Sequence, residues 1–125
     1  LGDVYKRQLY SRRRAFLTEL IQRHCMPYAL SDFSDNAGLH LILNLPAEAD
    51  DVAIAREANA RHILVRPLSR YFLTAARKKG LLMGFASQPE EQMASAFSVL
   101  LGCLQTHCPQ MLLLREDAEK QNAPT

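Results

Sequence analysis

The sequence lacks the features that identify several large classes of protein. It contains no apolar run near the roughly 20 residues that cross a bilayer, and its start has no apolar signal-peptide core. Its three cysteines include no CxxC pair, which disfavours a disulfide framework and favours a reducing compartment. The net charge of +2 is too small to indicate nucleic-acid binding. These absences predict a soluble, cytoplasmic protein with no membrane partner.

Motifs for catalysis and ligand binding are scarce as well. The sequence has neither a glycine-rich phosphate loop nor a G-x-S-x-G nucleophile motif. Cys103 and His107 are zinc-ligand types, but without a CxxC or HxxxH pair a buried cysteine is the simpler interpretation. Arg12, Arg13 and Arg14 point three ways around a helix, so we interpret them as a solvated face rather than a phosphate-contacting one. The residues alone predict no catalytic group, no metal ligand and no cofactor-binding group.

Hydrophobic periodicity, in contrast, is well developed over the 125 residues, a length that suits one domain rather than two. It favours a two-layer α+β sandwich, in which helices pack on one face of a small sheet of three or four strands. The expected helices cover residues 9–25, 50–61 and, after Ser87, through Leu104; the expected strands cover 38–45, 62–68 and 80–86. The predicted stripe of the first helix contains Leu9, Phe16, Leu20 and Arg23, widened by Leu17, Ile21 and Tyr10. The stripe of the last helix contains Met93, Ala96, Phe97, Leu100, Leu101 and Leu104.

Local signals predict where these elements begin. Asp50 or Asp51 can cap the second helix, because a carboxylate accepts hydrogen bonds from the free N–H groups of the first turn. Ser87 and Glu90 have the spacing of a capping box for the last helix. Residues 31–38, SDFSDNAG, are rich in Ser, Asp, Asn and Gly and are expected to form a surface turn.

The strand over 38–45, GLHLILNL, is unusual because it carries two polar residues among leucines. Its odd-numbered leucines point to one side, whereas His40, Ile42 and Asn44 point to the other. We interpret His40 and Asn44 as structural residues that satisfy hydrogen bonds at a seam between layers or domains. A direct ligand role is the alternative.

Four stretches in the same order resemble one known family. They are LYSRRRAFLTEL, AGLHLILNLP, VRPLSRYF and GLLMGFASQPEEQMASAFSVL, and together they span about residues 9–104. They are similar to the C-terminal small domain of fold type I pyridoxal-phosphate aminotransferases, most of all the MocR branch of GntR-type transcription regulators. The resemblance implies the same α+β sandwich as in the aminotransferase small domain.

The resemblance also implies that the chain is a fragment. Residues 1–8, LGDVYKRQ, are interpreted as an adapter-derived scar, with a natural arm as the alternative; residues 9–108 form the small domain and 109–125 a largely flexible tail. The parent would carry pyridoxal 5'-phosphate on a large domain of the same chain, form a homodimer and bind DNA through an N-terminal winged-helix domain. None of Lys6, Lys78, Lys79 or Lys120 lies in a motif that matches the Schiff-base lysine, so the fragment alone should bind no cofactor and catalyse nothing.

One position departs from the enzymes of this family. Aminotransferases usually place an arginine for the substrate carboxylate in the strand that matches GLLMGFA, and here that position is Leu82. This departure favours a sensor over a transaminase, and it directs attention to Arg66 and Arg70 as substrate-binding candidates. The alternatives are surface arginines, a parent that is a true aminotransferase, and a free-standing α/β interaction module. The effector and the operator stay open.

Overall fold

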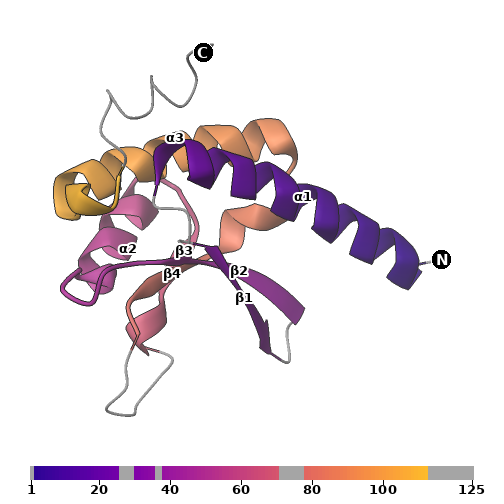
Figure 1. Ribbon diagram of the computed structural model, residues 1–125, viewed down its shortest axis with the longest axis horizontal. Helices are drawn as coiled ribbons and strands as arrows, with labels where there is room; N and C mark the ends of the chain where they lie inside the picture. The colour runs from indigo at the N-terminus through magenta and orange to yellow at the C-terminus, as the bar shows by residue number, and fades with distance from the viewer. Residues whose placement is uncertain (1, 26–29, 36–37, 71–77, 113–125) are drawn as a thin grey trace, which may run out of the picture.

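Within the residues that the structure describes, four strands form one antiparallel sheet in the order β1-β2-β4-β3, and three α-helices accompany it (Figure 1). This computed structural model describes residues 2–25, 30–35, 38–70 and 78–112. The strands are β1 Leu30–Asp35, β2 Gly38–Asn44, β3 Val65–Pro67 and β4 Gly80–Met83. The helices are α1 Gly2–His24, α2 Asp51–Ala60 and α3 Glu90–His107, and the 3₁₀ turns are η1 Leu68–Arg70, η2 Gly84–Ser87 and η3 Pro109–Met111.

The order of the strands follows from the connections between them. β1 and β2 pair directly as neighbours in the sequence, whereas β2 and β3 lie on opposite sides of β4. α2 carries the chain across between them and packs against β3. β1 and β3 are therefore the two edge strands of the sheet. β4, the last strand in the sequence, lies between β2 and β3.

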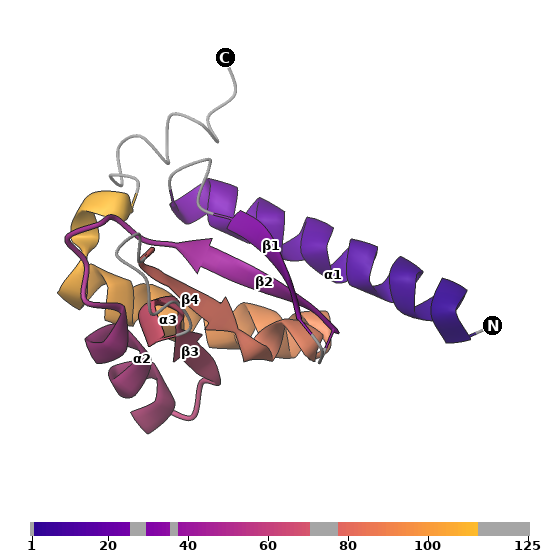
Figure 2. The same ribbon diagram turned by 90° about the horizontal axis from the view of Figure 1, so that it is seen from below.

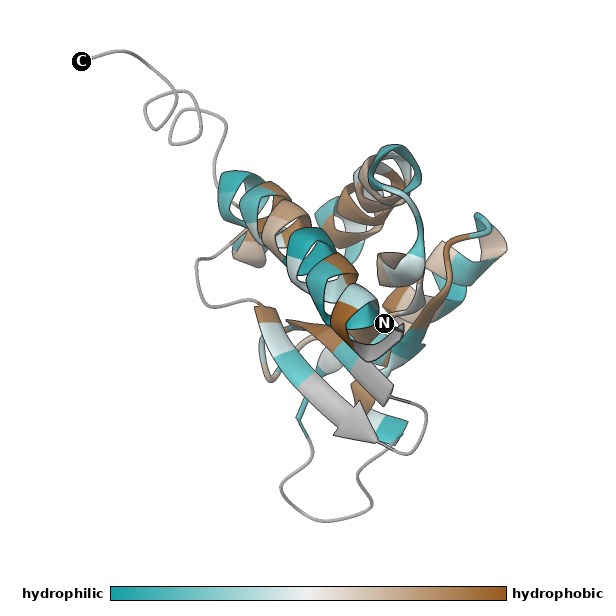
Figure 3. Cartoon of the chain, turned by 90° about the vertical axis from the view of Figure 1, so that its right-hand side faces the viewer, coloured by the Kyte–Doolittle hydropathy of each residue, from teal (hydrophilic) through white to brown (hydrophobic). Residues whose placement is uncertain are grey.

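One face of the sheet forms the main apolar core with the helices. Leu41 and Leu43 of β2 join Leu81 and Met83 of β4 in the main apolar core. α1 and α3 pack against each other on that side (Figure 1 and Figure 2), and hydrophobic and hydrophilic residues alternate along both helices (Figure 3). The predicted two-layer sandwich is therefore confirmed. The helical residues of the core are Leu17, Ile21, Ile54, Ala55, Ala58, Met93, Ala96, Phe97, Leu100, Cys103 and Leu104.

The last helix was predicted almost residue by residue. Its expected stripe is buried, apart from Leu101, which is partly buried at the edge of the core. The expected capping box was wrong, because Pro89 precedes the helix and Ser87 Oγ instead donates to Gly84 O at 3.3 Å. Ser87 belongs to η2, the turn that also ends β4 at Met83, three residues earlier than expected.

The stripe of the first helix is shifted from the prediction. Leu17 and Ile21 are its buried centre, and Phe16 and Leu20 lie at the margin. Arg23 is exposed and donates to Glu19, one turn earlier, so its place in the buried stripe was wrong. α1 also starts at Gly2, so residues 2–8 continue the helix; their interpretation as an adapter-derived scar stays a prediction.

Residues 31–35 form most of β1 rather than the expected turn, so that prediction was wrong. β1 pairs with β2 in register from Leu30 opposite Leu43 to Asp35 opposite Gly38. A polar segment can form an edge strand when its side chains find partners, because strand preference depends on cross-strand and packing contacts more than on intrinsic propensity. The partners here are on α1 and β2, far away in the sequence.

The strand expected over 62–68 is shorter, since only Val65–Pro67 pair with β4. His62 instead belongs to the turn that follows α2 and has φ 67°. At the C-terminal end, η3 follows α3 and Met111 is buried in the core. Residues 113–125, most of the expected tail, lie outside the described part of the chain.

Candidate functional site

A cavity of about 620 Å³ lies at one end of the sheet, beside the first half of α1. Volumes of this size are typical of sites for small molecules. It is built from five elements or their flanks, so residues far apart in the sequence meet there. Its lining consists of Lys6, Leu9, Tyr10 and Arg13 of α1, His40 and Leu41 of β2, Leu64 and Arg66 around β3, Leu82 and Met83 of β4, and Gly84, Ala86 and Ser87 of η2.

The lining combines an apolar floor with positive charge. Lys6, Arg13 and Arg66 contribute three cationic side chains, and no Asp or Glu lines the cavity within the described residues. Arg13 and Arg66 have no ion-pair or hydrogen-bond partner among the side chains that the structure describes. Acidic side chains lie next to the cavity rather than in its lining, since Tyr10 donates to Asp32 and Arg13 shares a neighbouring hollow with Glu90 and Glu91. The positive charge of the lining itself favours anions.

The structure separates the two arginines named from the sequence. Arg66 lines the cavity and is the direct cross-strand partner of Leu82, so the two side chains share one face of the sheet. Arg70 ends η1, is exposed and does not line this cavity. Arg66 thus lies at the cavity and opposite Leu82, whereas Arg70 does not; substrate binding by either arginine stays a prediction.

The two polar residues of β2, His40 and Asn44, lie in different surroundings. His40 lines the cavity together with Arg66. Asn44 does not, because its Nδ2 donates to Ser31 Oγ of β1 at 2.5 Å. Asn44 therefore holds the β1–β2 pair together, which agrees with a structural role.

Asp51 is a buried carboxylate that the sequence suggested only as an alternative cap of the second helix. It is 0% exposed, and its oxygens accept from Ser69 N at 2.9 Å, Ser69 Oγ at 2.6 Å and Gly80 N at 3.3 Å. One side chain thereby joins the first residue of α2 to η1 and to the start of β4. The neighbouring Asp50 performs the expected capping, with its Oδ1 accepting from Ala53 N at 3.0 Å.

A second carboxylate, Asp32 of β1, fixes α1 beside the cavity. Its oxygens accept from Arg14 Nε at 2.8 Å, from Arg14 Nη2 at 2.9 Å and from Tyr10 Oη at 2.6 Å. Hydrogen bonds from Arg14 and then Tyr10 lower the pKa of Asp32. Burial, followed by the hydrogen bond to Asp32, raises the pKa of Tyr10 to about 12, so its hydroxyl stays protonated. Tyr10 also lines the cavity, which makes this cluster part of its wall.

Replacing Asp32 by asparagine should lower the free energy of unfolding at neutral pH by about 0.5–1 kcal/mol, because the pair it removes is largely exposed. The lowered pKa means that the carboxylate stabilises the fold above its unfolded value of about 3.9 and stops doing so as the pH falls through the folded value. The difference between wild type and Asp32→Asn should therefore close in acid. Thermal unfolding by circular dichroism at neutral pH and at about pH 2.5 measures it; a difference that is equal at both would contradict the assignment.

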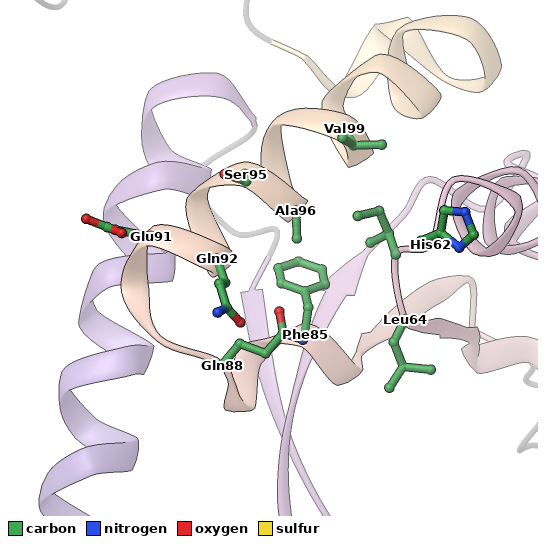
Figure 4. A pocket seen from close by; sticks show the side chains of 10 residues that line it. His62, Leu64, Phe85, Gln88, Glu91, Gln92, Ser95, Ala96 and Val99 are labelled. Carbon is green, nitrogen blue, oxygen red and sulfur yellow. The ribbon is translucent and has the colours of Figure 1, made fainter.

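A second, shallower cavity of about 450 Å³ lies on the other side of Leu64, which lines both. Figure 4 shows the Phe85 ring beneath Ala96 of α3, with His62 and Leu64 on the opposite side of the hollow. Leu64 is 56% exposed and packs on the backbone of η2, where a Cβ at Gly84 would lie 2.6 Å from Leu64 Cγ. This hollow carries no cluster of cations, so it is the weaker candidate for an anionic ligand.

Other polar clusters support the fold instead of forming a reactive site. Glu57 of α2 accepts from Arg61 at 2.9 Å and contacts His107 of α3 at 2.5 Å, which ties the two helices together. Burial raises the pKa of the Cys103 thiol, and it raises that of Cys25 to about 12, so both are poor nucleophiles. Within the described residues no three His, Cys, Asp or Glu side chains are grouped to hold a metal ion.

The chain was compared with known protein families, with curated proteins and with solved structures, and none of the three comparisons gave a match. Among the described helices, none has both the length and the apolar character that a membrane crossing requires.

Proposed function

We propose that this chain is the C-terminal small domain of a pyridoxal-phosphate-dependent transcription regulator of the MocR branch. In the parent, the aminotransferase-like part senses an effector and alters DNA binding by a winged-helix domain. The domain by itself neither binds the cofactor nor catalyses a reaction. The proposal places the parent in the cytoplasm as a homodimer, with the large domain of the same chain as the first partner.

The observation that carries the proposal is the position of Arg66. The resemblance puts Leu82 where aminotransferases keep the arginine for the substrate carboxylate, and Arg66 stands directly opposite Leu82 on the next strand. A guanidinium binds a carboxylate through two parallel hydrogen bonds, which leucine cannot offer. A guanidinium on β3 in place of one on β4 supports a site that holds a carboxylate differently from the enzymes, as suits a sensor.

The lysines are consistent with a cofactor held elsewhere. Lys6 lies on α1, exposed, and Lys78 and Lys79 precede β4. Lys120 lies outside the described residues. The proposal assigns the pyridoxal phosphate of the parent to a lysine of the large domain.

Two measurements test the proposal. The DNA immediately 5' of this reading frame should encode a large domain with a Schiff-base lysine and, before it, a winged helix. In that parent, Arg66→Gln should weaken effector binding by about tenfold or more, because a charged hydrogen-bonding partner is lost. The visible absorbance of the bound cofactor should be unchanged.

Arg56→Gln, on the exposed surface of α2, is the matched control and should leave effector affinity unaltered. Arg70→Gln tests the second arginine in the same assay. A large domain without a winged helix would make the parent an aminotransferase, and an upstream start signal just before Leu9 would make the chain a free-standing interaction module. Either result would remove the proposal.

A further inference from the structure

We infer that the cavity between α1 and the sheet binds a small organic anion with an apolar tail, and that this chain alone is sufficient for the binding. The inference goes beyond the proposed function, because it needs neither the cofactor nor a second domain. It rests on two arginines from different elements, Arg13 of α1 and Arg66 of β3, which line the cavity together with apolar residues.

The positive charges of the lining favour a negatively charged ligand. Arg13 and Arg66 remain unpaired within the described part of the chain, whereas the neighbouring Arg14 is neutralised by Asp32. Two guanidinium groups at one cavity, with no acidic side chain in the described lining, offer charge-assisted hydrogen bonds to an anionic head. A cationic ligand would meet repulsion there, and a neutral one would gain only burial.

The floor selects the rest of the ligand. Leu9 and Ala86 are half-buried and Leu64 is exposed, and all three line the cavity, so they provide an apolar base that a ligand can contact. Burying a ligand's apolar surface against such a base contributes roughly 25 cal/mol per Å². A compact inorganic anion would not contact this base. The lining therefore favours a ligand that has both an anionic head and an apolar tail.

Lys6 also lines the cavity, but it lies among the residues interpreted as an adapter-derived scar. The inference does not depend on it. A chain that begins at Leu9 keeps Arg13, Arg66 and the Tyr10–Asp32 contact that holds α1 beside the cavity. Binding should therefore survive the removal of residues 1–8 with no more than about a threefold loss, the size expected for one screened, exposed charge.

The test uses the complete 125-residue chain and four ligands that share one alkyl tail: octanoate, octyl phosphate, octanol and octylammonium. Binding is followed by amide chemical shifts in two-dimensional NMR, which give both the affinity and the location. We expect at least one of the two anions to bind about tenfold or more tightly than octanol, and the cation to be the weakest. The shifts should be centred on Leu41, Leu82 and Ala86.

Arg13→Gln and Arg66→Gln should each weaken anion binding about tenfold. Arg12→Gln is the matched control, because Arg12 is exposed and does not line this cavity. Equal affinity for octanoate, octyl phosphate and octanol would overturn the inference. So would anion binding that both Arg13→Gln and Arg66→Gln leave unchanged, or that disappears when residues 1–8 are removed. These results come from this chain alone and are independent of what lies upstream of it.

Discussion

Asp51→Ala should lower the free energy of unfolding by about 3 kcal/mol, one of the largest effects of any substitution in this chain. The carboxylate is fully buried, and its loss leaves Ser69 N, Ser69 Oγ and Gly80 N without their acceptor. Each buried donor left unsatisfied costs roughly 1–3 kcal/mol, offset in part by removal of a buried charge. Urea unfolding followed by circular dichroism measures the change.

The adjacent Asp50 provides the control. Asp50→Ala removes only the N-cap of α2 and should cost about 1 kcal/mol. Asp51→Asn keeps the shape but turns an NH₂ toward one of the donors, so it should fall between the two alanine variants. If the two alanine substitutions cost the same, Asp51 does not hold the three elements together.

Phe97→Ala should destabilise the fold by about 3–5 kcal/mol, because it removes a large ring from the centre of the core. Phe97 is 1% exposed on α3, and its ring lies 6.3 Å from that of His24 at the end of α1, with an interplanar angle of 49°. The substitution therefore leaves a cavity between the two helices. Chemical unfolding with a second probe, such as hydrogen exchange of α1 amides, should show that α1 loses protection.

Val99→Ala is the matched comparison on the same helix. Val99 is only partly buried, and its truncation should cost about 1 kcal/mol or less. An effect of Phe97→Ala no larger than that of Val99→Ala would contradict the packing of α1 on α3.

The parts of the fold that the sequence predicted are those that depend on nearby residues. The stripe of α3 repeats at i, i+3 and i+4, and burial of such a stripe needs only some apolar partner layer. The same reasoning placed β2 and limited the cap of α2 to Asp50 or Asp51, of which Asp50 is the cap. It centred the stripe of α1 less well, because Leu17 and Ile21, which only widened the predicted stripe, are the residues that the core buries.

The features that escaped prediction depend on pairings across long stretches of chain. β1 looked like a turn because its polar residues gave no sign that α1 would satisfy Asp32. The burial of Asp51 depends on Ser69 and Gly80, 18 and 29 residues away, and an Asp-Asp pair at a helix start does not indicate which member turns inward. The candidate site likewise depends on the register that sets Arg66 opposite Leu82, which no local pattern encodes.

The character of the two edge strands limits how another protein can join this one. β3 has three residues and ends in Pro67, whose nitrogen has no hydrogen to donate. β1 carries Asp32, and a charged side chain on an edge strand discourages a further strand from pairing there. Recognition by β-augmentation, in which a peptide extends a sheet through main-chain hydrogen bonds, is therefore disfavoured at both edges. A protein that binds this domain should therefore contact its side chains rather than pair with the main chain of an edge strand.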